Sequence, residues 1–357
     1  MSSERLFHLA PPGRYNPSMD EDFAAAGNWA VIGHDWAIDM LRRSLLKGRQ
    51  RHAYLIAGAP SLGKRSLALA FARALNCEAA DIAARPCGKC RACRAISRAN
   101  DPDLIVAKGV EGAPLKIDEI REVTRLLALK PYAARYRIAI LADFDRVAPL
   151  AQDSLLKTLE EPAEHAVLII LASSSERVLP TIRSRAQTIP LRPAPLGLVK
   201  AALIERGCEE ARADLIARLS GGRTGWALAA MRDDEPLAFR AEMLDKLRDV
   251  VAGGRLARIK LAEELNKRFG RDKKAVRGIL EIWLSYWRDV LLQCYESPVK
   301  PCNGDRAADI GALATGIEPS GARAALEATS RTIDALTTNA NVRLALDALF
   351  LDYPGLE

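Results

Sequence analysis

The chain has 357 residues and a formal net charge of +7, and 49% of its residues are hydrophobic and 27% charged. This composition excludes an extensively disordered chain and is ordinary for a globular protein long enough for two or three domains. No apolar run approaches the ~18 residues of a membrane span, and the amino terminus lacks the basic-then-apolar layout of a signal peptide. We therefore expect a cytoplasmic protein without a membrane partner.

The first segment, residues 1–28, contains several prolines and shows no sustained period, so we expect a loosely docked arm. A helix should follow over Trp36–Leu46, because the apolar positions 38, 41 and 45 share one face. Arginine and lysine side chains decorate this helix. They could contact DNA phosphate or an acidic partner, but a solvated face is the simpler interpretation.

A phosphate-binding loop is predicted directly after a short strand, Ala53–Ala57. The run Gly58-Ala-Pro-Ser-Leu-Gly63-Lys64-Arg65 supplies glycines that let backbone amides curl round phosphates and a lysine that reaches them. The last position of such a loop carries a Ser or Thr hydroxyl on magnesium, and the arginine found here cannot ligate a cation. The pattern therefore predicts a P-loop fold, argues against magnesium-dependent hydrolysis and leaves ATP or ADP binding doubtful.

Four of the seven cysteines are grouped in the sequence, at Cys77, Cys87, Cys90 and Cys93. Two consecutive Cys-x2-Cys steps let thiolates converge on one ion, and the fourth cysteine completes the closed tetrahedral set of a structural zinc site. Four sulfur ligands leave no open position for water, which argues against catalysis by the metal. Reduced surface thiols that are grouped by chance are the alternative.

Strands and helices alternate through the next segment. Short apolar runs predict buried strands, and apolar stripes at helical spacing predict helices between them. The strands are expected at Asp103–Ala107, Arg137–Leu141 and Val167–Ala172, and the helices at Ile117–Leu129 and Pro149–Glu161. Because strand, helix and strand repeat in this order, the fold class is α/β with a parallel sheet and flanking helices.

A proline-rich linker at residues 190–195 separates this segment from a helical remainder. The helices expected there are Leu198–Glu205, Arg212–Ser220, Leu237–Val251, Leu256–Phe269, Lys273–Cys294, Arg306–Thr315, Gly321–Leu336 and Asn339–Leu351. One of them carries a heavy apolar stripe that includes Trp283 and Trp287. Such a stripe favours a place in a core over an exposed interface.

Two motifs in this order resemble the bacterial clamp-loader branch of the AAA+ ATPases: Leu155-Leu-Lys-Thr-Leu-Glu-Glu-Pro162 and, after a strand, Thr181-Ile-Arg-Ser-Arg185. The cysteine spacing and the final helix are also similar to that family. The resemblance implies an AAA+ P-loop module with a zinc insertion, a small helical lid and an all-α collar domain. The implied boundaries are 1–28 for the arm, 29–192 for the AAA+ domain with the zinc module at 77–93, 193–234 for the lid and 235–357 for the collar.

The resemblance also assigns roles to single residues. Arg185 would be an arginine finger that reaches a neighbouring subunit's nucleotide site, and a helix-end arginine paired with a carboxylate is the alternative. Ser174 stands where the family has a γ-phosphate sensor, although serines there also suit a plain strand exit. Counting back from the first motif puts the family's magnesium-organising Asp at Ala142 and its Glu at Asp143. Trp226 stands in place of the second sensor arginine.

Three elements that an ATPase needs are therefore altered, while the arginine that it would lend is intact. The resemblance implies an ATPase-defective arginine donor that joins gamma/tau and delta clamp-loader subunits in a ring and helps to load the sliding clamp onto primer-template DNA. Two alternatives remain. An active ATPase of gamma/tau type would have to use Asp143 and Asp145 in a shifted register. A zinc-containing DNA-binding adaptor would have no role in ATP turnover.

Overall fold

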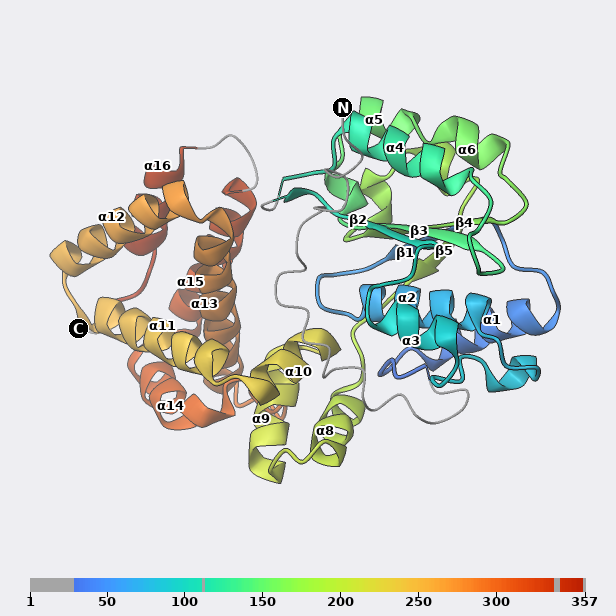
Figure 1. Ribbon diagram of the computed structural model, residues 1–357. Helices are drawn as coiled ribbons and strands as arrows, with labels where there is room; N and C mark the ends of the chain where they lie inside the picture. Colours follow the sequence, from blue (N-terminus) through green and yellow to red (C-terminus); the bar gives the residue numbers. More distant parts are fainter. Residues whose placement is uncertain (1–28, 111–112, 337–340, 356–357) are drawn as a thin grey trace. The chain divides into compact units, whose positions relative to one another are not determined.

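The computed structural model describes residues 29–110, 113–336 and 341–355 (Figure 1). The arm expected at residues 1–28 lies outside these ranges. The chain divides into two compact units: the first comprises the residues up to Val199 together with Gly222–Trp226, and the second comprises Lys200–Gly221 and the chain from Ala227 onwards. Within the described ranges, no helix combines the length and hydrophobicity needed to cross a lipid bilayer.

A parallel sheet of five strands is the centre of the first unit, in the order β2-β3-β4-β1-β5. The strands are β1 (Ala53–Ala57), β2 (Leu104–Ala107), β3 (Arg137–Leu141), β4 (Ala166–Ala172) and β5 (Gln187–Pro190). Every residue of β1 and β4 is buried, which is the mark of central strands in a parallel sheet covered on both faces. The predicted α/β class with a parallel sheet and flanking helices is confirmed.

Different helices cover the two faces of this sheet (Figure 1). One face carries α1 (Asp35–Leu46), α2 (Lys64–Asn76) and α3 (Arg91–Ser97), and the other carries α4 (Ile117–Leu127), α5 (Pro149–Asp153), α6 (Leu156–Glu160) and α7 (Pro180–Arg183). Side chains of β1 alternate between the two cores: Tyr54 and Ile56 belong to the first, and Leu55 belongs to the second. This is the period of two that strand geometry imposes.

Helices make up the second unit. Their bounds are α8 (Leu196–Glu205) and α10 (Thr224–Arg232), which both begin in the first unit, and α9 (Glu210–Ser220), α11 (Glu235–Ala252), α12 (Arg255–Arg271), α13 (Lys273–Cys294), α14 (Ala307–Gly316), α15 (Pro319–Ala335) and α16 (Val342–Leu351). Trp283 and Trp287 of α13 are fully buried, and the indole of Trp283 donates to the carbonyl oxygen of Met243 at 2.8 Å. The apolar stripe on this helix is core, as predicted.

The helix predicted over Pro149–Glu161 is instead two short helices, α5 and α6, with a break at Ser154. The Ser154 hydroxyl donates to the carbonyl oxygen of Ala151 at 2.7 Å, and this is the carbonyl that the amide of Leu155 would use in a continuous α-helix. That amide donates to Gln152 instead, at 3.1 Å. A side chain that competes for a backbone acceptor therefore explains the break.

Sequence reasoning missed β5, which pairs in parallel with β1 at one edge of the sheet. Its four residues include one fully buried apolar side chain, Ile189, and end in Pro190. Proline cannot donate to a strand ladder and is tolerated at a sheet edge. The apolar signal of an edge strand is therefore weak, and the proline made the segment resemble a linker.

Asp103, immediately before β2, is a buried carboxylate that organises the loop before β3. It accepts hydrogen bonds from the backbone amides of Tyr132, Ala133 and Ala134 at 2.6, 2.9 and 2.9 Å, and Arg137 lies 3.9 Å away. Burial alone would raise the pKa of Asp103, but the amide donors and Arg137 outweigh it, and the pKa lies below its ordinary value.

We predict that Asp103→Asn lowers the free energy of unfolding at pH 7 by about 1–3 kcal/mol, because the amide side chain cannot accept all three bonds. The pKa of Asp103 is depressed in the folded state, so its contribution is complete above an unfolded pKa of about 3.9 and is lost as pH falls through the folded value. Urea denaturation should show a smaller difference in the free energy of unfolding between variant and wild type at pH 3 than at pH 7. Asp118→Asn, at an exposed ion pair, is the control, and an equal loss there would contradict the assignment.

Candidate functional site

The predicted phosphate-binding loop connects the carboxyl end of β1 to the start of α2. Gly58 has a φ of +155°, and a Cβ there would lie 2.6 Å from the carbonyl oxygen of Leu191. Gly63 has a φ of +89° and precedes α2. Both positions therefore require glycine, for close backbone approach at the first and for a left-handed backbone at the second.

Lys64 lies inside this loop and is engaged by it. Its ammonium group donates to the carbonyl oxygen of Gly58 and, at 2.8 Å, to that of Ala59. Two further loop carbonyls are also occupied: Ser61 accepts from the amide of Gly225 at 2.8 Å, and Leu62 lies 2.7 Å from Nε2 of the buried His34. The loop is thus held in its present form by contacts within the chain.

Two carboxylates at the end of β3 influence Lys64. Burial lowers the pKa of Lys64, and Asp145 and Asp143 oppose this effect through their negative charges. Asp145 is buried, and its Oδ1 accepts from the amide of Ser173 at 2.8 Å, which joins the ends of β3 and β4. Asp143 has a left-handed backbone with a φ of +51°. Both acids therefore act on Lys64 through their charge, and Asp145 also has a structural hydrogen bond.

The two other residues assigned to the nucleotide site are Arg65, in α2, and Ser174, after β4. Arg65, in the first turn of α2, is exposed. Ser174 follows β4, and its hydroxyl accepts from the amide of Glu176 at 3.2 Å at the start of a short 3-10 helix. A hydrogen bond from a backbone amide to a nearby serine side chain is common where a strand ends in a turn.

Arg185 follows α7 and forms an exposed ion pair. Its guanidinium donates to the carboxylate of Glu160, at the end of α6, at 2.8 Å, and the two side chains are 38% and 52% exposed. The paired arginine that the sequence left open as an alternative is thus present within the chain. Exposed pairs contribute only about 0–1 kcal/mol, so this guanidinium can exchange partners at low cost.

Gln152 positions the segment that carries Arg185, and sequence reasoning missed it. Its buried side chain accepts from the amide of Leu179 at 3.0 Å and donates to the carbonyl oxygens of Val147 and Arg177 at 2.9 and 3.2 Å. These bonds tie α5 to the residue that caps α7. A single glutamine in an apolar segment gives no signal of such a role, because two of its partners, Arg177 and Leu179, lie 25 and 27 residues away in sequence.

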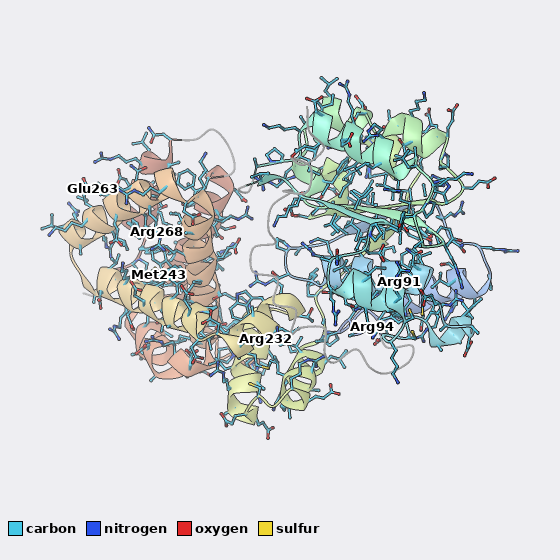
Figure 2. The ribbon with its side chains drawn as sticks, viewed as in Figure 1. Arg91, Arg94, Arg232, Met243, Glu263 and Arg268 are labelled. Carbon is cyan, nitrogen blue, oxygen red and sulfur yellow. The ribbon has the colours of Figure 1, made fainter. Side chains whose placement is uncertain are left out.

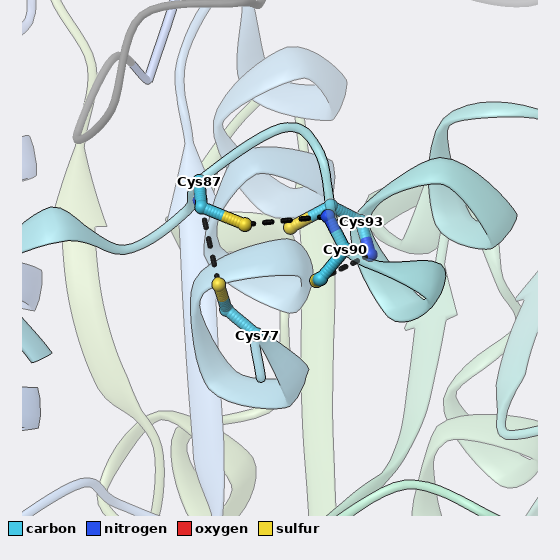
Figure 3. Close-up of side chains that lie close together, drawn as sticks. All are labelled: Cys77, Cys87, Cys90 and Cys93. Atoms are coloured by element: carbon cyan, nitrogen blue, oxygen red, sulfur yellow. Dashed lines mark hydrogen bonds between the residues drawn. The ribbon is translucent and has the colours of Figure 1, made fainter. Parts of the chain in front are cut away.

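The four cysteines converge at the start of α3 (Figure 3). Their sulfur atoms all lie within 4.8 Å of one another, and Zn–S bonds of about 2.3 Å in a tetrahedron place sulfurs about 3.8 Å apart. The backbone amides of Cys87, Cys90 and Cys93 each donate to the sulfur of the preceding cysteine of the set at 3.4 Å.

The chemistry of this donor set fits a bound cation. Burial raises the pKa of the thiols of Cys77 and Cys93, so their thiolates need a positive charge beside them. The amide donors described above also favour thiolate over thiol. Residues that come from the end of α2, a loop and α3 thus form a closed four-sulfur set that could hold zinc.

The fold and the loop define this chain as a P-loop protein of the AAA+ type. Residues 33–195 match the family model described as DNA polymerase III, delta subunit. The tau subunit of DNA polymerase III from Bacillus subtilis is 28% identical, over 82% of this chain and 52% of its own length. The delta-prime subunit from the same bacterium is 29% identical, over 71% of this chain and 75% of its own length. The chain is therefore homologous to the tau and delta-prime subunits of bacterial DNA polymerase III.

These similarities have limits. The match spans about half of the Bacillus tau subunit, 52%, and 37% of the gamma/tau subunit from Mycobacterium tuberculosis. A solved gamma-subunit-related protein from Thermotoga maritima is 16% identical with a TM-score of 0.43, over 88% of this chain and 97% of that one. That distant likeness carries no argument about function.

We predict that Arg185→Ala changes the free energy of unfolding by no more than about 1 kcal/mol, because its ion pair is exposed. The measurement is urea denaturation of the full chain. Arg240 provides the contrast, since it is buried and donates to Asp305 and Asn303. Arg240→Ala should cost about 3–5 kcal/mol. A large loss for Arg185→Ala would mean that this arginine is a structural element.

Proposed function

We propose that this chain is a delta-prime-type subunit of a DNA polymerase III clamp loader, which lends Arg185 to a neighbouring subunit and does not turn over ATP itself. One observation carries the proposal: Arg185 stands exposed just after α7, where its guanidinium makes one exposed ion pair, with Glu160, and exposed hydrogen bonds to the carbonyl oxygen of Thr181 and the hydroxyl of Ser184. Arg65, by contrast, occupies the magnesium position of the chain's own loop. The homology to the delta-prime and tau subunits supports the clamp-loader part of this proposal and applies equally to both types of subunit.

The chain's own nucleotide site is proposed to be defective for reasons of charge and geometry. An arginine at position 65 cannot supply the oxygen that magnesium needs. Lys64 would have to leave the carbonyls of Gly58 and Ala59 before it could reach a phosphate. Trp226 adds no positive charge where the family has its second sensor arginine. Each change weakens either metal binding or phosphate neutralisation.

In the proposed mechanism Arg185 exchanges Glu160 for the γ-phosphate of ATP bound next door. Its planar guanidinium offsets the negative charge that develops on the phosphate oxygens as the bond to the β-phosphate breaks. Fingers of this kind accelerate turnover by roughly 10³–10⁵, or about 4–7 kcal/mol. The neighbours are proposed to be gamma/tau and delta subunits, and turnover by the ring would load the sliding clamp onto primer-template DNA.

A motor ATPase of gamma/tau type is the second candidate. The observation that favours it is the pair of carboxylates, Asp143 and Asp145, whose charges act on Lys64. An active site would need one of them for magnesium. Asp145 already accepts the amide of Ser173 at 2.8 Å, and Asp143 would have to take over that role.

We predict that Arg185→Ala lowers the ATPase rate of the reconstituted ring by 10-fold or more, up to the roughly 10³–10⁵ of a complete finger. The rate is measured with gamma/tau and delta subunits of the same source, in the presence of clamp and primed DNA. Glu160→Gln is the matched control: it removes the partner of Arg185 but leaves the guanidinium, so the rate should be unchanged or higher. The isolated chain should show no turnover.

Other outcomes assign the chain differently. Turnover by the isolated chain that disappears in Lys64→Ala would make it a motor subunit. An unchanged ring ATPase in Arg185→Ala, together with DNA binding by the isolated chain, would make it an adaptor without a role in ATP turnover.

We also propose that the four cysteines hold one structural zinc ion. Zinc supplies about 10–16 kcal/mol of apparent binding free energy in zinc-finger peptides near pH 7, and a closed four-sulfur site has no position for a substrate. We predict that the purified chain contains zinc, that Cys90→Ser abolishes it, and that the melting temperature falls. Metal content is measured by atomic absorption and unfolding by calorimetry. Cys208→Ser, outside the set, should change neither, and a metal-free wild-type chain with the same melting temperature would contradict the proposal.

A further inference from the structure

Helix α3 of the cysteine module presents a basic face that the clamp-loader role leaves unexplained. Arg91, Arg94 and Arg98 stand at positions i, i+3 and i+7, with Arg98 at the helix cap. At 100° per residue these positions fall within an arc of about 60°, and they span about 10 Å along the axis. Figure 2 labels Arg91 and Arg94 on this helix.

The module fixes the direction of this face. Ala92, Cys93 and Ile96 are buried on the inner side of α3, whereas the three arginines are exposed. The inner side is anchored twice: Cys93 belongs to the four-sulfur set, and Ser97 accepts a hydrogen bond from the buried Arg73 at 3.1 Å. The arginines therefore project from a rigid support and not from a loop.

The charge on this face is largely uncompensated. Arg91 interacts with the carboxylate of Asp101. The side chains of Arg94, Arg98 and the neighbouring Lys89 make no ion pair with any residue in the described ranges. On α4 of the same unit, by contrast, exposed arginines pair with carboxylates one turn away.

The surroundings favour a phosphate over a protein surface as the partner. In the described residues between Leu46 and Val110, no large hydrophobic side chain is exposed. Protein interfaces depend on buried aromatic or aliphatic anchors, which this face lacks. Arginine forks match phosphate oxygens in two-point contacts, and about half to two-thirds of protein–DNA hydrogen bonds go to phosphate and sugar oxygens, with arginine and lysine among the donors.

We propose that this basic α3 face, made of Lys89, Arg91, Arg94 and Arg98, binds the phosphate backbone of nucleic acid. The binding is electrostatic and independent of sequence, because nothing on the face can read base edges. The inference does not rest on the role of Arg185, since the face lies on a different element and acts without ATP.

A competing explanation is that the arginines balance the charge of the metal site. Four thiolates and one Zn²⁺ carry a net charge of −2, and nearby cations would stabilise them. In that case removal of the arginines would weaken metal binding, whereas a phosphate-binding face can be neutralised without loss of zinc.

The test uses the full chain with the triple substitution Arg91→Gln, Arg94→Gln and Arg98→Gln. Binding to a fluorescein-labelled 30-base-pair duplex is followed by anisotropy between 50 and 200 mM NaCl. We expect at least a 10-fold loss of affinity at the lowest salt. The slope of log K against log salt should become less steep by about 2.7, because each of the three lost phosphate contacts contributes about 0.9. The zinc content should stay at the wild-type level.

The matched control is Lys260→Gln, Lys267→Gln and Arg271→Gln on α12, which removes the same charge from exposed cations elsewhere. It should leave DNA affinity within twofold of the wild type. Equal losses in the two triple variants, loss of zinc in the α3 variant, or preferential binding of polyglutamate over DNA would each overturn the proposal. The α3 variant keeps Arg185, so it should leave the ATPase rate of the ring without DNA at the wild-type level. A failure of the proposed function would therefore show in the ring ATPase of Arg185→Ala, and a failure of this inference would show in the DNA affinity of the α3 variant.

Discussion

The placement of β1 between β4 and β5 is the constraint on which the rest of the first unit depends. Parallel pairing on both sides, from Ala53 with Leu168 to Ala57 with Ala172 and Pro190, brings the carboxyl ends of neighbouring strands to one edge of the sheet. The loop that begins at Gly58 leaves from that edge. Asp145 joins the ends of β3 and β4 there, because its side chain accepts a hydrogen bond from the amide of Ser173. A Cβ at Gly58 would collide with the backbone at Leu191 just after β5, so the loop and the edge strand require each other.

Elements buried on all sides could be predicted to within a residue, and elements at an edge could not. β1 and β3 were placed correctly because their apolar runs are continuous. β5 was missed since an edge strand needs little burial and tolerates Pro190. The break in the helix at Ser154 was missed for another reason: the competition of the Ser154 hydroxyl for a backbone acceptor does not show in a hydrophobic pattern.

The same division holds for the candidate sites. The four cysteines could be found from spacing alone, because local chain geometry suffices to bring Cys87, Cys90 and Cys93 together. The partners of Lys64 could not be predicted, since they depend on the conformation of the loop, and neither could the contacts of Gln152, which join separate elements. What Arg185 does in a ring depends on a second chain, and no property of this sequence alone determines it.

The contrast between Arg185 and Arg240 gives the donor hypothesis its physical content. Arg240 is buried and bonded to Asp305 and Asn303, so moving it would leave buried polar groups unsatisfied at a cost of several kcal/mol. Arg185 has only exposed contacts, to the carboxylate of Glu160, the carbonyl oxygen of Thr181 and the hydroxyl of Ser184, and an exposed ion pair contributes about 0–1 kcal/mol. A finger that stabilises a neighbour's transition state by about 4–7 kcal/mol would retain nearly all of that effect after leaving Glu160. An arginine held as Arg240 is held would lose most of it, so weak attachment in the free subunit is the property that a donated arginine requires.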